Sequence, residues 1–153
     1  MTSTRPDLMY DVSLISRLME SPKDSHWKVG KIILRYVAGT AGYGLWYTRA
    51  SDCTVTGYID SDFVGCIDDQ KSTSGYGFHF GTSLISWASK KQPIVSLSSA
   101  EAEYVADTTA ACHAVWLQRL LKDMGHAVTD TTTIFCDNSS VIALSKNHVS
   151  QEK

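Results

Sequence analysis

Three carboxylates occupy positions where protein chains often place functional side chains. Asp60 ends the apolar segment 55–59, and Asp137 directly follows the β-branched segment 131–136. Glu103 lies near the start of the longest helical pattern in the chain. Acidic groups that gather at strand ends repel one another, and a hard divalent cation bound through oxygen relieves that repulsion. The three acids are therefore candidate ligands of a metal site.

Each of these acids also has a purely structural interpretation. Asp60 and Asp62 could belong to a turn, although residues i and i+2 of a strand would share one face. Asp137 could be the N-cap of the following helix, a position that aspartate fills well. Glu103 could sit at the border of its helix face and reach solvent. Position alone leaves these alternatives open.

The helical phase separates Glu103 from its neighbour Glu101. At about 100° per residue, Glu103 falls at the edge of a small-residue face that includes Ala106 and Ala110, whereas Glu101 falls near the opposite side. A charge on a packed face is costly unless it is paired or binds a cation. Ser98 and Glu101 have the spacing of a capping box, in which the Glu101 carboxylate accepts from the Ser98 N–H. Glu101 is therefore assigned to capping and Glu103 to the candidate site.

The hydrophobic pattern predicts the elements that must position these acids. Helices are expected over 10–19, 24–39, 99–124 and 139–146, and strands over 43–47, 55–60, 74–81, 84–88 and 131–136. This order predicts an α/β or α+β layer with an antiparallel start and one crossover after the long helix. The first two helices carry no charged constellation and are interpreted as a packing appendage. Trp46, Trp87 and Trp116 are expected in the core.

Composition limits the partners that the chain can bind. The 153 residues fit one compact domain with a short appendage, and the formal net charge is −2. A domain that held nucleic acid by bulk electrostatics would be basic, so any such binding should be local and weak. Lys71, Lys90 and Lys91 are the locally concentrated basic residues. No apolar run is long enough to span a bilayer, and the first residues do not read as a signal peptide.

The cysteines and histidines suggest no separate chemistry. Cys53, Cys66, Cys112 and Cys136 form no C-x-x-C pair, so free thiols are expected. The five histidines have no metal-ligand spacing, and no glycine pattern resembles a phosphate loop.

Several sequence blocks carry a family resemblance, and they occur in family order over nearly the whole chain. The blocks are Thr4–Asp7, Ile33–Tyr36, Tyr43–Tyr47, Gly57–Phe63, Lys71–Tyr76, Ser86–Gln92, Ser96–Ala106 and Cys136–Ser139. The chain resembles the C-terminal end of copia-type long-terminal-repeat retrotransposon Pol polyproteins. That region comprises the tail of the reverse transcriptase, matched by residues 1–48, and the ribonuclease H domain, matched by residues 49–153.

The resemblance implies a ribonuclease H-like mixed sheet with crossing helices, preceded by a small helical appendage. It implies an endonuclease that hydrolyses the RNA strand of an RNA–DNA hybrid. Asp60, Glu103 and Asp137 match the first three acids of the family. They would hold two Mg²⁺ or Mn²⁺ ions about 4 Å apart, one activating water and one stabilising the leaving oxygen. Lys71, Lys90 and Lys91 are the expected nucleic-acid contacts.

The C-terminus departs from the family pattern. The family continues into a segment with a fourth acid and a last strand and helix, whereas here Asn147 is followed only by residues 148–153. Glu152 has no motif around it and is not assigned as the fourth ligand. We therefore expect a truncated ribonuclease H-like domain with little or no nuclease activity. An uncovered sheet edge would favour self-association.

A non-enzymatic alternative follows from the same resemblance. Some sequences of this kind are described as secreted RxLR-type effectors of oomycete pathogens, which suppress host cell death and would act on a host protein. This chain contains no R-x-L-R tetrapeptide, the nearest segment being Arg119–Lys122. The enzyme interpretation implies an intracellular location, and the effector interpretation implies secretion into a host cell.

Overall fold

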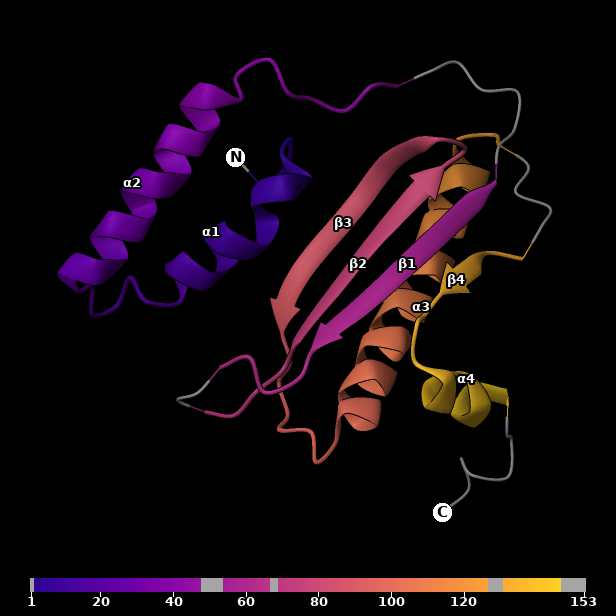
Figure 1. Cartoon of the computed structure of the whole chain (residues 1–153). Coiled ribbons are helices and arrows are strands. Elements are labelled where there is room, and N and C mark those ends of the chain that lie inside the picture. Colours follow the sequence, from indigo (N-terminus) through magenta and orange to yellow (C-terminus); the bar gives the residue numbers. More distant parts are fainter. Residues whose placement is uncertain (1, 48–53, 67–68, 127–130, 147–153) are drawn as a thin grey trace. The chain divides into compact units, whose positions relative to one another are not determined.

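The computed structural model describes residues 2–47, 54–66, 69–126 and 131–146 (Figure 1). The chain divides into two compact units, residues 1–47 and residues 48–153. Within the described ranges, no helix is both long and apolar enough to cross a membrane.

The first unit is a small helical assembly. It contains a 3₁₀ turn, η1 (Pro6–Leu8), and two helices, α1 (Met9–Ser16) and α2 (Asp24–Gly39), which pack on each other. Leu8 and Ile33 are its buried apolar side chains. The helix α2 ends at the predicted glycine, Gly39, and the N–H of Thr40 donates to the Tyr36 carbonyl at 2.9 Å.

Arg5 fastens the start of this unit to the end of α2. Its Nη2 donates to Thr40 Oγ1 at 2.8 Å and to Asp7 Oδ2 at 2.7 Å. The guanidinium also lies over the Tyr36 ring, 5.6 Å from the ring centroid. Arg5 therefore holds the pKa of Asp7 down to about 2, below its ordinary value of 3.8.

The predicted strand over residues 43–47 is wrong. This segment has no regular secondary structure. The strand pairings in the described part of the chain join other segments only, and a strand needs a partner for its backbone N–H and C=O groups. Trp46 is 84% exposed, so its predicted place in the core is wrong as well. Tyr43, Leu45 and Tyr47 are spaced as on one face of a strand, but this local pattern carries no information on a partner.

The second unit is built on a four-stranded mixed sheet. The strands β1 (Val55–Asp62), β2 (Thr73–Phe80), β3 (Ser83–Lys91) and β4 (Thr133–Phe135) lie in the order β3-β2-β1-β4. The first three strands pair antiparallel, and β4 pairs parallel to β1. The α/β class, the antiparallel start and the crossover after the long helix are therefore confirmed. The turn between β2 and β3 is shorter than predicted, since Ser83 is already part of β3 and Gly81, at φ 58°, begins a two-residue turn.

One long helix covers one face of this sheet. The helix α3 (Ser99–Asp123) crosses behind β1 and β2 in Figure 1 and contacts both, and α4 (Ser139–Lys146) follows β4. The small-residue face predicted for α3 is the buried one, and its alanines are Ala102, Ala106, Ala110 and Ala114. Alanine side chains let a helix lie close to a sheet, so the backbones of α3 and β1 come near each other.

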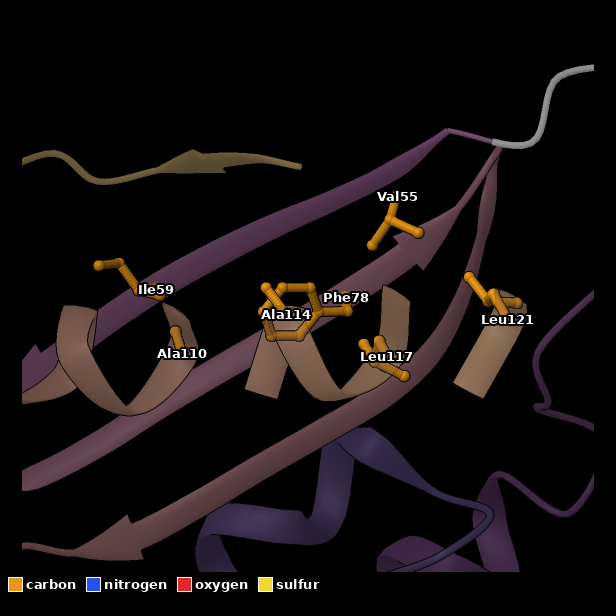
Figure 2. Close-up of a cluster of buried hydrophobic side chains, with 7 residues drawn as sticks. All are labelled: Val55, Ile59, Phe78, Ala110, Ala114, Leu117 and Leu121. Atoms are coloured by element: carbon orange, nitrogen blue, oxygen red, sulfur yellow. The ribbon is translucent and has the colours of Figure 1, made fainter. Parts of the chain in front are cut away.

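The core lies between this helix and the sheet. Figure 2 shows Val55, Ile59 and Phe78 from the strands facing the side of α3 that carries Ala114 and Leu117. The Phe78 ring is fully buried and lies over Gly57, where an added Cβ would come within 2.6 Å of the ring. Gly57 is thus required for this packing. Trp116 on α3 is 53% exposed, so its predicted place in the core is wrong.

Candidate metal centre

Glu103 is positioned by the first turn of α3. The Ser98 hydroxyl caps this turn by accepting from the Glu101 N–H at 3.1 Å, as predicted. The Glu101 carboxylate accepts from the Leu97 N–H at 2.6 Å rather than from Ser98, so the predicted capping box is only half formed. Glu101 is thus used at the helix start, whereas Glu103 is buried against the sheet with 7% of its surface exposed.

A buried glutamine ties the same turn of α3 to the end of β3. Gln92 is 3% exposed, and its Nε2 donates to Ser74 Oγ and to the Ala102 carbonyl, both at 2.8 Å. Its Oε1 accepts from Ser96 Oγ at 3.0 Å. Because Ala102 directly precedes Glu103, this network fixes the backbone that carries the candidate ligand.

The strands bring the two aspartates to one edge of the sheet. Tyr58 of β1 pairs with Phe135 of the parallel strand β4. Asp60 and Asp137 each lie two residues further along, at the carboxyl ends of neighbouring strands, where functional sites gather in α/β sheets. Asp60 is part of β1 and pairs with Gly75, so its interpretation as a turn residue is wrong.

Neither aspartate is used up by local capping of a helix. The N-terminus of α4 is capped by Asn138, whose Oδ1 accepts from the N–H groups of Ser140 at 3.0 Å and Val141 at 3.3 Å. The interpretation of Asp137 as the N-cap is therefore wrong. Asp60 Oδ1 accepts from the Ser61 N–H at 2.8 Å, which orients that carboxylate.

The electrostatics of Glu103 reflect this convergence. Burial raises the pKa of Glu103, and the negative charges of Asp60 and then Asp137 raise it further, while the Ser61 backbone N–H lowers it. The Oε2 atom of Glu103 is buried and has no hydrogen-bond partner. A buried, unpaired carboxylate oxygen beside two other acids is costly, and a bound cation would remove that cost.

Cys136 joins this group, which the sequence interpretation did not foresee. One ligand atom each from Glu103, Cys136 and Asp137 lie within 4.8 Å of one another. Asp60 is not in this tight group and acts on it through its charge. The available signal was the position of Cys136 directly after β4, a strand with only Ile134 half-buried, and directly before Asp137. Glu152 lies outside the described residues.

Carboxylate oxygens are the ligands that Mg²⁺ and Mn²⁺ prefer. The donor atoms of Asp60, Glu103 and Asp137 therefore fit such an ion chemically, and Glu103 brings a buried oxygen, Oε2, that has no hydrogen-bond partner.

The three lysines differ in how free their charges are. Lys91 Nζ forms an ion pair with Asp69 Oδ2 at 2.5 Å and donates to Cys66 Sγ at 3.3 Å, so its charge is largely balanced. Lys90 is exposed, and with Lys91 it lines a hollow between the end of β3 and α3. Lys71 is half-buried in the loop before β2. Their role as nucleic-acid contacts stays a prediction.

The fold and the acidic cluster together define an α/β domain with a candidate carboxylate metal centre. Comparison with known proteins supplies the family: the chain belongs to the retrovirus-related Pol polyproteins of copia-type transposons. No family model matches the chain, and no solved structure matches it.

Three relatives show the extent of the match. The retrovirus-related Pol polyprotein from transposon TNT 1-94 of Nicotiana tabacum is 44% identical over 96% of this chain and 11% of its own length. The corresponding protein from transposon RE2 of Arabidopsis thaliana is 39% identical over 95% of this chain and 10% of its own length. The chain thus spans about a tenth of these polyproteins. Secreted RxLR effector protein 161 of Plasmopara viticola is 44% identical over 76% of this chain and 82% of its own length.

Proposed function

We propose that residues 48–153 form a ribonuclease H-type domain that binds Mg²⁺ or Mn²⁺ and hydrolyses the RNA strand of RNA–DNA hybrids. The observation that carries this proposal is the buried, unpaired Oε2 of Glu103 beside the charges of Asp60 and Asp137. The family supports it, because the chain matches retrovirus-related Pol polyproteins over nearly its whole length, and the resemblance places a ribonuclease H domain in this region of them. The strand order β3-β2-β1-β4, with β4 parallel to β1, is compatible with a ribonuclease H-like fold.

The residues of the chain have separate tasks in this proposal. Bound cations would supply an activated water and charge stabilisation for the leaving oxygen. Asp60 and Asp137 contribute exposed carboxylates from neighbouring strand ends, and the Ser61 N–H orients Asp60. Glu103 contributes a carboxylate from a rigid helix turn held by Gln92. The ligands therefore come from three elements whose relative positions are fixed by the core.

Nucleic-acid binding should be weak and salt-sensitive. Since Asp69 neutralises much of the charge of Lys91, Lys90 and Lys71 are left as the stronger candidates for phosphate contacts. A few such contacts lose affinity steeply as the salt concentration rises. Tight binding of a hybrid that persisted at high salt would contradict this part of the proposal.

The test is cleavage of a labelled RNA–DNA hybrid with Mg²⁺ or Mn²⁺, alongside a calorimetric titration of the metal. Two cations need more oxygen ligands than three carboxylates readily give, so we expect measurable metal binding and slow cleavage. Asp60→Asn and Glu103→Gln should abolish both. Glu101→Gln is the matched control, because Glu101 lies on the same turn but its carboxylate accepts from the Leu97 N–H. Cleavage or metal binding unchanged by Glu103→Gln would refute the proposal.

The effector interpretation is the second candidate, favoured by the match over 82% of the Plasmopara viticola protein. It predicts that the chain, expressed in plant leaves, suppresses cell death triggered by a known inducer. Glu103→Gln separates the two functions, since suppression by a non-enzymatic protein should survive loss of the metal centre. Failure of the wild-type chain to suppress cell death would remove this alternative.

A further inference from the structure

We propose that Cys136 makes this centre a second kind of metal site, which binds a thiophilic divalent cation such as Zn²⁺ through Cys136 Sγ, Glu103 and Asp137. The inference rests on the proposed function in one respect, because it shares two carboxylates with the Mg²⁺ centre. It adds a ligand, a class of metal and a means of regulation to that centre.

The spacing of the ligand atoms suits one small cation. The three atoms lie within 4.8 Å of one another. Ligands of a tetrahedral zinc ion, with bonds of about 2.0–2.3 Å, lie about 3.5 Å apart. Closing this difference requires the Cys136 and Asp137 side chains to rotate, since Gln92 holds the helix turn that carries Glu103. Three protein ligands leave the fourth position of the zinc ion to water, so the bound ion stays exchangeable.

The burial of the group points to a ligand independently of the spacing. Glu103 is more than nine-tenths buried, and its Oε2 has no partner. Cys136 packs against the hydrophobic core of β1, β2 and α3, and its sulfur lies within 4.8 Å of a carboxylate oxygen of Glu103 on that helix. The Cys136 thiol, a soft donor, and the Glu103 carboxylate, a hard donor with an unpaired oxygen, therefore lie close together at a half-buried position.

The choice of cation follows from the donor atoms. Mg²⁺ takes oxygen ligands and gains little from a thiol, whereas Zn²⁺ and Cd²⁺ bind thiolate strongly. Binding replaces the thiol proton of Cys136 by the metal and releases that proton to solvent. Because Glu103 and Asp137 cannot serve both ions fully, the thiophilic cation competes with Mg²⁺ and would inhibit the nuclease.

The test is a titration with Cd²⁺, followed by the ultraviolet charge-transfer absorption of the cadmium–thiolate bond, and with Zn²⁺ by competition. The wild-type chain should show the band, and Cys136→Ser should lose it. Cys112→Ser and Cys66→Ser are the matched controls, since Cys112 is exposed on α3 and Cys66 lies beside Lys91. Cys136→Ser should lower the Zn²⁺ affinity at least about tenfold. Loss of a residue that only supports a metal ligand already costs about that much, and Cys136 would be a ligand itself.

Two further measurements keep the result decisive. Glu103→Gln should lower the Zn²⁺ affinity, and its far-ultraviolet circular dichroism spectrum should match that of the wild type. Unchanged Cd²⁺ absorption and Zn²⁺ affinity in Cys136→Ser would overturn the inference. Cadmium binding through Cys136 in a chain that cleaves no hybrid would support the inference and remove the proposed nuclease. Hybrid cleavage by a chain whose Zn²⁺ affinity is the same in the wild type and Cys136→Ser would support the proposed nuclease and overturn the inference.

Discussion

Replacing Glu103 by glutamine should make the metal-free protein more stable. Glu103 is 7% exposed, and its Oε2 atom has no hydrogen-bond partner. Glutamine has nearly the same shape, carries no charge and can donate its amide N–H groups to the neighbouring carboxylates. The substitution therefore removes a repulsion and keeps the packing.

The size of this effect can be estimated from the geometry. The reference distance is the 4.8 Å within which ligand atoms of Glu103 and Asp137 lie. Two unit charges that far apart repel by about 3 kcal/mol at an effective dielectric constant of about 20, and by about 1 kcal/mol in bulk water. Asp137 is exposed, so solvent screens the pair and the lower figure applies. The substitution also removes the cost of burying the Glu103 charge. We therefore expect the free energy of unfolding to rise by about 1–2 kcal/mol in total.

The assay is urea unfolding of the wild-type chain and Glu103→Gln, first with a chelator and then with Mg²⁺. Without metal the variant should have the higher midpoint. With Mg²⁺ at a concentration about 100 times its dissociation constant, the wild type should gain about 2.7 kcal/mol, and the variant should gain much less. With Mg²⁺, the unfolding midpoint of the wild type should therefore reach or exceed that of Glu103→Gln. The control Glu101→Gln should lower the midpoint, because it weakens the bond to the Leu97 N–H.

Two outcomes would refute this reasoning. A metal-free Glu103→Gln chain that is less stable than the wild type would show that the buried carboxylate is already satisfied. Equal stabilisation of both chains by Mg²⁺ would show that Glu103 is not a ligand.

Three further substitutions test the supporting structure. Gln92→Leu removes three buried side-chain hydrogen bonds and should lower the free energy of unfolding by about 2–4 kcal/mol, measured in urea. Gly57→Ala places a Cβ within 2.6 Å of the buried Phe78 ring, and a fall of about 1–3 kcal/mol in the thermal unfolding free energy is expected. The depressed pKa of Asp7 stabilises the first unit above pH 3.8, and this contribution should be lost as the pH falls towards about 2. A helical signal in Asp7→Asn that falls as steeply as the wild type over this range would contradict the role of Arg5.

Local patterns in the sequence were sufficient for most of the second unit. The phase of α3 identified Glu103 as the buried acid and Glu101 as the helix-start acid, because helical periodicity depends only on neighbouring residues. The strand-end positions of Asp60 and Asp137 were also evident. Their closeness depends on the parallel pairing of β1 with β4, which the proposed topology implied.

The wrong predictions concern strand, cap and ion-pair partners, which a local sequence pattern does not specify. Residues 43–47 are rich in the aromatic residues that strands favour, but the strands of the described sheet pair with other segments. Asp137 and Asn138 are equally good capping residues by type, and only the backbone geometry shows that Asn138 takes the cap. Lys91 reads as a free charge, although Asp69 lies within ion-pair distance across a loop. The spacing of Cys136 matches no cysteine motif, so the sequence alone assigns it no metal.

The parallel pairing of β1 with β4 also has a consequence for how the protein folds. The strands β2 and β3 are joined by a short turn, whereas Thr56 pairs with Thr133, far along the chain. Closing so long a loop costs entropy that only later contacts return, so β4 should dock after the hairpin and α3 have formed. Pulse-labelled hydrogen exchange should then protect β2 amides before those of β4, and simultaneous protection would argue against this order. On this pathway the acidic centre is completed in the last step of folding, so a chain that has folded only in part carries its ligands but cannot yet hold a metal ion.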